Sequence, residues 1–301
     1  MNLYTQAESN IRKTWLYLFF FFVLVIAVGW AVSYYFNSPA ILYVAVVISI
    51  LMNFFAYWYS DKIVLSMQRA REIEKKDNPE LYRTVENLCI TAGLPVPRVY
   101  IIDSLQPNAF ATGRNAEKAV VVVTKGLLEK LDRTELEGVL AHELSHIGNK
   151  DMLLQTVVVV LVGFIVVLTD FFFRISFWGG MGRKNNREGG QIGTVIMILA
   201  LALAILSPIL AQLIKLAISR KREFLADSSG ALLTRYPEGL AKALEKISSD
   251  QEVLKTANDA TAHLWIASPF RGKEQKSWLH GLFLTHPPVE ERVKVLRGMQ
   301  V

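Results

Sequence analysis

The stretch VLAHELSHIGNKDMLLQTVVVVLVGF, residues 139–164, decides the fold predicted for this chain. Its first half contains His142, Glu143 and His146 in the pattern H-E-x-x-H, and its second half is a long apolar run. Residues four apart on a helix share one face, with β-carbons about 6 Å apart, so the two imidazoles can bind one zinc ion. Glu143 is then placed to take a proton from an attacking water. The sequence therefore predicts a hydrolytic zinc site directly beside a membrane.

The composition indicates an integral membrane protein. Of the 301 residues 52% are hydrophobic, which exceeds the roughly 45–50% of an ordinary soluble domain. No charged residue occurs from Thr14 to Ser60, and Asn37-Ser38-Pro39 divides this stretch into two pieces of about 20 residues, each long enough to span a bilayer. We expect spans at about 15–36 and 40–59 in an N-terminal hairpin, residues 1–60. A cleaved signal peptide is the alternative for the first span, but its apolar core is too long and no small-residue cleavage site follows.

Two further apolar runs predict a second membrane hairpin over residues 152–215, with spans at about 152–171 and 192–214. Residues 61–151 and 216–301 then form the two parts of one domain outside the membrane. The expected fold class is a mainly α integral membrane protein with four transmembrane helices and an α+β domain that carries a small sheet.

The formal net charge of +6 does not indicate a nucleic-acid partner, because the basic residues cluster beside the spans and are not interleaved with aromatic residues in one patch. More of these residues flank one side of the four-span topology than the other. By the positive-inside rule, the N-terminus, residues 61–151 and the C-terminal third are expected to be cytoplasmic. The richer side has Arg12, Lys13, Lys62, Arg69, Arg71, Lys150, Lys215, Arg220, Lys221 and Arg222, and the poorer side has Arg174, Arg183, Lys184 and Arg187.

Local signals place the motifs of this domain on helices and strands. Asn78 can cap a helix that Gly93 can end. The segments RVYIID and AVVVVTKG predict strands, and NAFATG between them predicts a short third strand or strand-like edge. A helix begins at Asp132, which has Glu135 at capping-box spacing, and carries the H-E-x-x-H pattern. Further helices are expected around the R-E-F-L-A-D segment and from residue 237 to 248, and the poorly periodic residues 249–284 predict a loop-rich region.

A catalytic zinc site needs a third protein ligand, and the acidic residues downstream of the histidines limit the choice. Asp151 is predicted on the same helix as the histidines and therefore cannot turn back onto the metal. Asp170 and Glu188 lie at or beyond the far end of a span, about 30 Å away. Glu223 and Asp227 are the first acidic residues after the fourth predicted span, on the same side of the membrane as the histidines. Their i, i+4 spacing places both side chains on one face of a helix. One can bind zinc while the other accepts an N–H from a ligating imidazole, and spacing leaves both assignments open.

The motifs H-E-L-S-H, R-E-F-L-A-D and T-H-P-P, with a hydrophobic hairpin between the first two, resemble the HtpX family of membrane zinc endopeptidases. These are gluzincins related to the CAAX-prenyl endopeptidases, and the resemblance covers nearly the whole chain. It implies one zinc ion per chain, held by His142, His146 and Glu223, with Glu143 as general base and Asp227 as the acid behind a ligating imidazole. It also implies a multi-pass protein of a bacterial inner membrane whose site faces the cytoplasm.

The same resemblance implies substrates and partners. They would be misfolded or damaged membrane proteins and unfolded polypeptides, cleaved in protein quality control under stress, with the lipid bilayer as the other partner. NAFATG would be an edge strand that pairs with an extended peptide substrate, or else an ordinary turn and short strand. His286 could donate a hydrogen bond to the tetrahedral oxyanion, or else belong to a helix start. The substrate-binding residues of the edge strand would be Asn108, Ala109, Phe110 and Ala111.

Several alternatives remain open on the sequence alone. The H-E-x-x-H helix could be an exposed polar helix with two unrelated histidines, and Glu223 could balance the basic residues 220–222. A processing protease for a lipidated or defined peptide is the second enzymatic hypothesis. A transporter is disfavoured because the spans lack a convincing buried charge pair, and a catalytically silent scaffold is disfavoured by the intact H-E-x-x-H pattern.

Overall fold

The computed structural model describes residues 3–35, 37–179, 220–254, 256, 261–269 and 287–299. Its described part is mostly helical and carries one small mixed sheet. The predicted fourth span, residues 192–214, and His286 lie outside the described residues, as does most of the expected loop-rich region.

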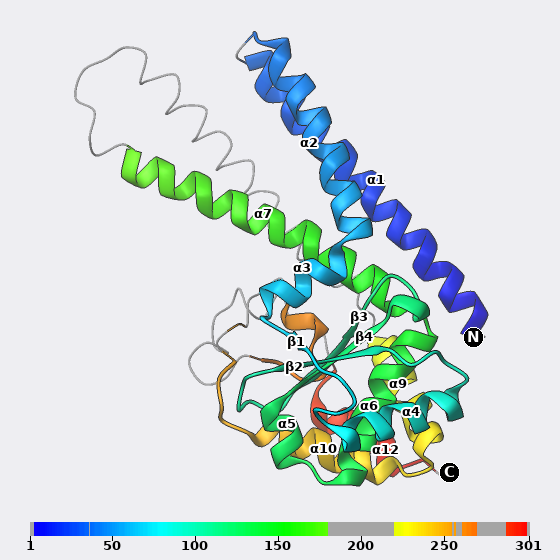
Figure 1. Ribbon diagram of the computed structural model, residues 1–301. Helices are drawn as coiled ribbons and strands as arrows, with labels where there is room; N and C mark the ends of the chain where they lie inside the picture. The colour runs from blue at the N-terminus through cyan, green and yellow to red at the C-terminus, as the bar shows by residue number, and fades with distance from the viewer. Residues whose placement is uncertain are drawn as a thin grey trace.

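Two antiparallel helices form the N-terminal hairpin, α1 (Leu3–Tyr35) and α2 (Pro39–Trp58). Both contain segments long and apolar enough to cross a membrane, Glu8–Tyr34 and Pro39–Trp58, and these candidate spans overlap the first two predicted ones. The hairpin and α7 (Asp151–Gly179) project from the same side of the globular part (Figure 1). The third predicted span lies within α7. Helix α1 starts well before the predicted span, so its first turns continue beyond the apolar segment toward the globular part.

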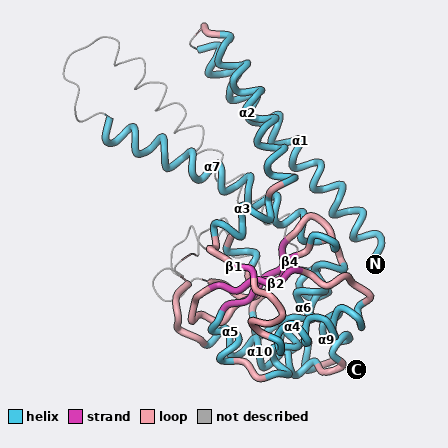
Figure 2. The backbone as a smooth tube through the Cα atoms, in the orientation of Figure 1, coloured by secondary structure: helices cyan, strands magenta, loops and turns pink. Residues whose placement is uncertain are grey.

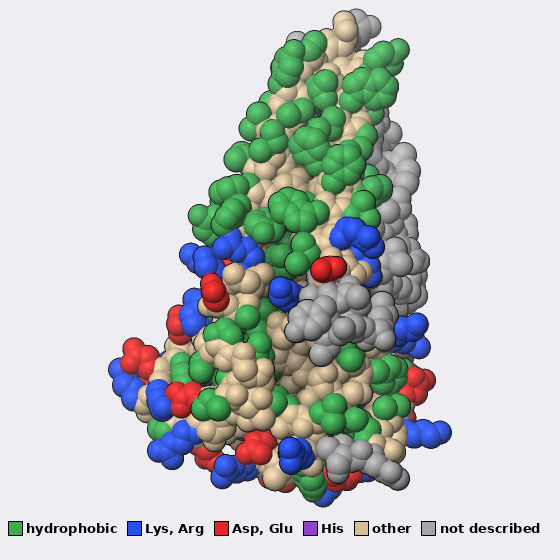
Figure 3. Space-filling model, turned by 90° about the vertical axis from the view of Figure 1, so that its right-hand side faces the viewer, with side chains coloured by type: hydrophobic (Ala, Val, Ile, Leu, Met, Phe, Trp, Pro, Cys, Tyr) green, Lys and Arg blue, Asp and Glu red, His purple; other side chains and the backbone are tan. Residues whose placement is uncertain are grey.

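The surface of the hairpin is apolar beyond the first turns of α1, which carry Glu8, Arg12 and Lys13. Figure 3 shows hydrophobic side chains covering the stem, and lysines and arginines gathering where the stem meets the globular part. Phe19, Trp30 and Tyr43 are 64%, 60% and 70% exposed. A contiguous exposed apolar surface of this extent is typical of a membrane-facing region.

The prediction that Asp151 shares a helix with the two histidines is wrong. Two residues separate the end of helix α6 (Arg133–Gly148) from the start of α7, and the two helix axes differ in direction by 86°. The turn is made by Asn149 and by Lys150, whose φ of 55° lies in the left-handed region. Asp151 is therefore the first residue of a new helix, and its side chain can return toward α6.

The sheet, whose strands are magenta in Figure 2, has the strand order β1-β2-β4-β3. Its strands are β1 (Arg71–Glu72), β2 (Arg98–Ile102), β3 (Ala109–Thr112) and β4 (Val120–Thr124). Strands β2 and β4 are parallel, and the other two pairings are antiparallel, with β3 at one edge of the described sheet. The three predicted strands are confirmed. The two residues of β1 are both exposed and too few for any periodic signal.

Helices cover both faces of the sheet. On one face, Val99, Val121 and Val123 share a core with the helices α4, α6, α9, α10 and α12. On the other face, Val120 and Val122 pack against α3 and the first turns of α7. The helices named for the first time are α3 (Ser60–Met67), α4 (Pro79–Ala92), α5 (Lys125–Lys130), α9 (Arg220–Thr234), α10 (Pro237–Ser249) and α12 (Val289–Arg297).

Part of the expected loop-rich region belongs to the core. Trp265 follows a short 3-10 turn, Ala262–Leu264, and is fully buried. Its ring meets that of Phe110 on β3 edge to face, with ring centroids 4.8 Å apart. Next to it, the N–H of Ile266 donates to the carbonyl of Ala109 at 3.0 Å. Residues 265–267 therefore run along the outer edge of β3.

The predicted helix caps are confirmed. The side chain of Asn78 accepts a hydrogen bond from the N–H of Leu81, and Gly93 ends α4 with a φ of 66°. Asp132 and Glu135 form the complete capping box at the start of α6. This box fixes the residue at which α6 begins. His142 and His146 then lie on one face of the helix because they are four residues apart.

Helix α9 lies in close contact with α6 at Gly230. A β-carbon at this position would lie 2.9 Å from the backbone nitrogen of His142, closer than a side chain tolerates. The absence of a side chain here lets α9 lie directly against the turn of α6 that carries the H-E-x-x-H pattern.

We expect Gly230→Ala to push α9 away from α6 and to destabilise the protein by roughly 1–3 kcal/mol. The unfolding temperature of the purified protein in detergent should fall, and bound metal should be lost together with it. Leu232→Ala changes a side chain that is 59% exposed on the same helix and should leave both properties near wild type. An unchanged unfolding temperature for Gly230→Ala would contradict the close packing of the two helices.

Candidate metal centre

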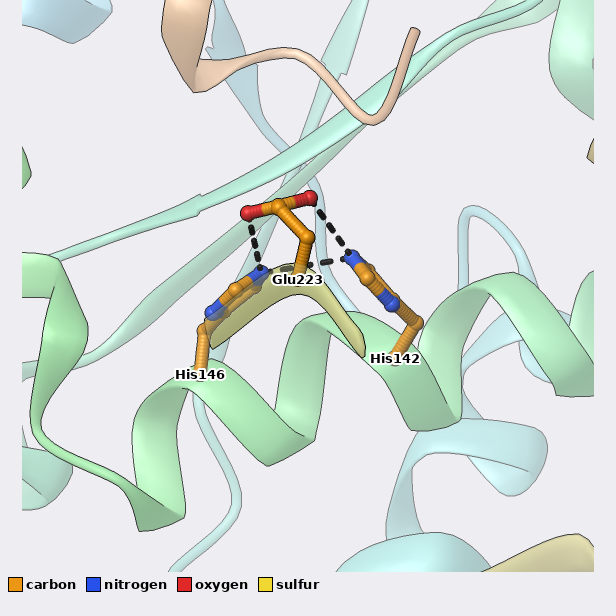
Figure 4. A group of neighbouring side chains, drawn as sticks. All are labelled: His142, His146 and Glu223. Carbon is orange, nitrogen blue, oxygen red and sulfur yellow. Dashed lines mark hydrogen bonds and ion pairs between the residues drawn. The ribbon is translucent and has the colours of Figure 1, made fainter. Parts of the chain in front are cut away.

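Two imidazoles and one carboxylate from separate helices meet inside the globular part (Figure 4). His142 and His146 lie one turn apart on α6, and Glu223 comes from α9. One ligand atom from each of the three lies within 4.8 Å of the other two. All three residues are buried, with 1%, 6% and 0% of their surfaces exposed. The H-E-x-x-H helix is therefore not an exposed polar helix.

The distances between these atoms suit a small metal cation. The Nε2 atoms of His142 and His146 are 3.2 Å apart. The two carboxylate oxygens of Glu223 lie 3.9 Å from Nε2 of His142 and 3.6 Å from Nε2 of His146. Ligands of a tetrahedral zinc ion at 2.0–2.1 Å are separated by about 3.3 Å. The nitrogen and oxygen donor set and its spacing therefore fit zinc.

His142 is held from behind by an acid that is itself held by an arginine. Its Nδ1 lies 2.9 Å from Oδ1 of Asp227 on α9. Arg292 on α12 donates to both oxygens of Asp227, at 2.9 and 2.7 Å, and to the carbonyl of Ile266 at 2.9 Å. Burial would raise the pKa of Asp227, but the charge of Arg292 outweighs it and lowers the pKa to about 2. Asp227 is therefore a stable anion that orients the ring of His142.

His146 is held in the same way by Asp151. Its Nδ1 lies 3.2 Å from Oδ2 of Asp151, the first residue of α7. Burial lowers the pKa of His142 to about 4. Burial acts on His146 too, but the hydrogen bond to Asp151 and the charge of Glu223 outweigh it and raise the pKa to about 9. Each imidazole thus has its own carboxylate on the side away from the shared Nε2 position.

Glu143 is buried beside the edge strand of the sheet. Its exposed fraction is 2%. Burial raises its pKa to about 7, and the negative charge of Glu223 adds to this effect. The backbone N–H of Ala111 on β3 hydrogen-bonds its carboxylate and partly opposes the rise. A carboxylate with a pKa near neutrality can both take up and release a proton at physiological pH.

The predicted substrate-binding residues of β3 are all buried, with 0–4% of their surfaces exposed. Asn108 and Ala109 already bond residues of the same chain on the outer edge of the strand. The Nδ2 of Asn108 donates to the carbonyl of Ala267 at 3.0 Å, and the carbonyl of Ala109 accepts from Ile266. The backbone of Ala111 contacts Glu143.

Two supporting residues of the centre do not follow from the sequence reasoning. Arg292 shares the buried face of α12 with Val293 and Leu296, and an arginine in an apolar stripe signals a buried acidic partner. The sequence reasoning places Asp151 on the wrong helix. An acidic residue at the very start of an apolar span also signals a buried polar or charged partner. The other predicted residues of the metal centre meet as expected, whereas His286 lies outside the described residues.

Comparisons with known proteins found one matching family and several similar proteins. The model of the family described as "Peptidase family M48" matches residues 75–300. The "Protease HtpX homolog" of Dictyoglomus thermophilum is 46% identical over 98% of this chain and 94% of that protein. The protein of the same name from Pyrococcus furiosus is 48% identical over 95% of this chain and 94% of that protein. Among solved structures, the crystal structure of S. mikatae Ste24p has a TM-score of 0.48 at 18% identity and covers 97% of this chain and 66% of that one.

We expect Arg292→Ala to leave the buried carboxylate of Asp227 without its cation, at a cost of roughly 3–5 kcal/mol. Zinc affinity should fall as well, because Asp227 no longer fixes the ring of His142. Equilibrium dialysis against zinc and thermal unfolding in detergent measure the two effects.

Arg297→Ala is the matched control, because Arg297 lies on the same helix and pairs with Glu238 and Glu245, but at an exposed position. It should lose far less stability and no zinc affinity. Equal losses from both variants would show that the Asp227 to Arg292 contact has no special role.

Proposed function

This chain belongs to peptidase family M48 and is a membrane metallopeptidase, and on that premise we propose that it is a zinc-dependent endopeptidase. Zinc is proposed to be held by His142, His146 and Glu223, with Glu143 as the general base. The substrates are proposed to be misfolded or damaged membrane proteins and unfolded polypeptides. The proposal depends mainly on one observation: ligand atoms of the buried residues His142, His146 and Glu223 all lie within 4.8 Å of one another.

The chain's own residues suggest how a peptide bond is hydrolysed. A bound zinc ion would supply Lewis-acid polarisation of the scissile carbonyl. Glu143 takes a proton from the attacking water and passes it to the leaving amine, a role that its pKa near 7 suits. Asp227 and Asp151 keep the two imidazoles in the tautomer that presents Nε2 to the metal. The role of His286 as an oxyanion donor stays a prediction from the sequence.

The peptide substrate is proposed to bind in an extended form beside β3. An exposed strand edge recognises a peptide through backbone hydrogen bonds, independently of its side chains. This suits a protease that cleaves many unfolded sequences. Because Ala111 contacts Glu143, we place the scissile bond near this residue. Binding along Asn108 and Ala109 requires residues 266–267 to leave the edge that they occupy.

We propose that the protein crosses the inner membrane of a bacterial-type cell four times, with the zinc site on the cytoplasmic side. The excess of basic residues beside the globular part supports this orientation. Two of them lie over aromatic rings at the end of α2: the Arg114 guanidinium is 4.2 Å from the Trp58 ring centroid, and Lys62 Nζ is 5.5 Å from that of Tyr59. Aromatic and basic residues at one depth are typical of the level of the lipid headgroups.

Substitutions of Glu143 and Glu223 should have different effects on zinc binding and on cleavage. Glu143→Gln should keep bound zinc and abolish cleavage, because an amide cannot take the proton of the water. Glu223→Ala should lose zinc together with activity, because two imidazoles alone bind zinc much more weakly. Zinc content and cleavage of casein, measured in detergent with and without chelator, test both variants.

The control is Glu137→Gln, an acid on the same helix that pairs with Arg133 at the surface and should behave as wild type. If Glu223→Ala retains full zinc and wild-type turnover, the third ligand lies elsewhere and the proposed site is wrong. Wild-type protein without zinc and without cleavage would overturn the proposed function itself.

The four-span topology predicts which positions face the outside of the cell. Single cysteines can be introduced after Cys89, the one native cysteine, is removed. Ser38→Cys, at the tip of the first hairpin, and Arg187→Cys, between the last two apolar runs, should both react with an impermeant thiol reagent on intact cells.

The matched position on the other side is Lys76→Cys, which should react only after the membrane is permeabilised. Reaction of the Arg187→Cys protein from the cytoplasm alone would contradict the second hairpin. Reaction of Lys76→Cys on intact cells would reverse the proposed orientation.

A further inference from the structure

Helix α1, which begins the membrane stem, reaches the metal centre through Asn10. The side chain of Asn10 is 3% exposed, although it lies only about 7 Å of helix before Trp15, where the predicted span begins. Its Nδ2 donates to Oδ1 of Asp151 at 2.6 Å and lies 3.4 Å from the carbonyl of Asn149. A buried amide on a largely apolar helix is costly unless it is hydrogen-bonded, and here both partners lie at the bend between α6 and α7.

The two oxygens of Asp151 serve different partners. Oδ1 accepts from Asn10, and Oδ2 lies 3.2 Å from Nδ1 of His146. A carboxylate is rigid and planar, so fixing one oxygen fixes the position of the other. Asn10 therefore limits the rotation of the Asp151 side chain, and through it the orientation of the imidazole of His146.

Asn10 also lies close to the first turn of α9, the helix that carries Glu223. The guanidinium of Arg222, the residue before Glu223, lies 3.5 Å from Oδ1 of Asn10 and 3.6 Å from Oδ1 of Asp151. Arg222 is 5% exposed. Asn10 thus contacts Asp151, which supports His146, and Arg222, which precedes Glu223. Asn10 itself lies outside the family match at residues 75–300.

We propose that Asn10 is a positioning residue of the metal centre, through which the first membrane helix holds Asp151 behind His146. This role rests on the zinc site proposed above. It makes α1 part of the catalytic centre as well as a membrane anchor. A shift of α1 by one residue along its axis, about 1.5 Å, would break the hydrogen bond to Asp151, so the centre is complete only when α1 is seated against α7.

Two variants separate the hydrogen bond from the bulk of the side chain. Asn10→Asp keeps the shape and the oxygen that faces Arg222, but it replaces the donor to Asp151 by a second carboxylate. Asn10→Ala removes the polar group altogether. Thr14→Val is the matched control: Thr14 is also buried on α1, but its hydroxyl donates only within the helix, to the carbonyl of Asn10 at 2.9 Å.

The readouts are the affinity for Zn²⁺ alone, by competition with a chelator, and the visible spectrum of the Co²⁺-substituted protein, which reports ligand geometry. Both Asn10 variants should bind Zn²⁺ about 10–100-fold more weakly than wild type, with altered Co²⁺ spectra. Thr14→Val should match wild type in both. The unfolding temperature of the metal-free proteins should be similar for Asn10→Ala and Thr14→Val, which separates a loss of positioning from a loss of fold.

The outcomes distinguish this role from the proposed function. Asn10→Ala with wild-type affinity and spectrum would overturn the role of Asn10 and leave the zinc site intact. An equal loss of affinity in Thr14→Val would overturn it as well, because packing of α1 alone would then explain the effect. Wild-type protein that binds neither Zn²⁺ nor Co²⁺ would overturn the proposed function and this role with it.

Discussion

Two imidazoles and a carboxylate meet away from water in this protein, and most of its architecture follows from holding them there. Buried ionisable groups are costly unless each has a partner of suitable charge. His142 therefore has Asp227 with Arg292 behind it, and His146 has Asp151. These supports come from α7, α9 and α12, so the centre forms only when segments far apart in the chain are assembled.

The membrane part and the catalytic part depend on each other through this centre. The 86° bend after α6 starts the apolar helix α7 and at the same step turns Asp151 back to His146. Helix α9 brings Glu223 close to the two histidines. The first residue of the apolar helix α7 therefore also supports His146, which joins this helix to the candidate metal centre.

Local features of this fold could be predicted from the sequence because each has a local cause. The capping box at Asp132 and the i, i+4 spacing of the histidines act within one helix, and the valines of β4 read as a buried strand. The choice between Glu223 and Asp227 could not be made from spacing, since both share one face of α9. The contact of Arg292 with Asp227 and that of Asn10 with Asp151 join residues 65 and 141 positions apart, and no periodicity encodes such pairs.

X-ray absorption at the zinc edge of the purified wild-type protein shows directly which atoms coordinate the metal. If His142, His146 and Glu223 bind zinc, the protein should contain stoichiometric zinc coordinated by two imidazole nitrogens and by carboxylate or water oxygens, with no sulfur. A shell that contains sulfur, or fewer than two imidazoles, would contradict the centre built from His142, His146 and Glu223.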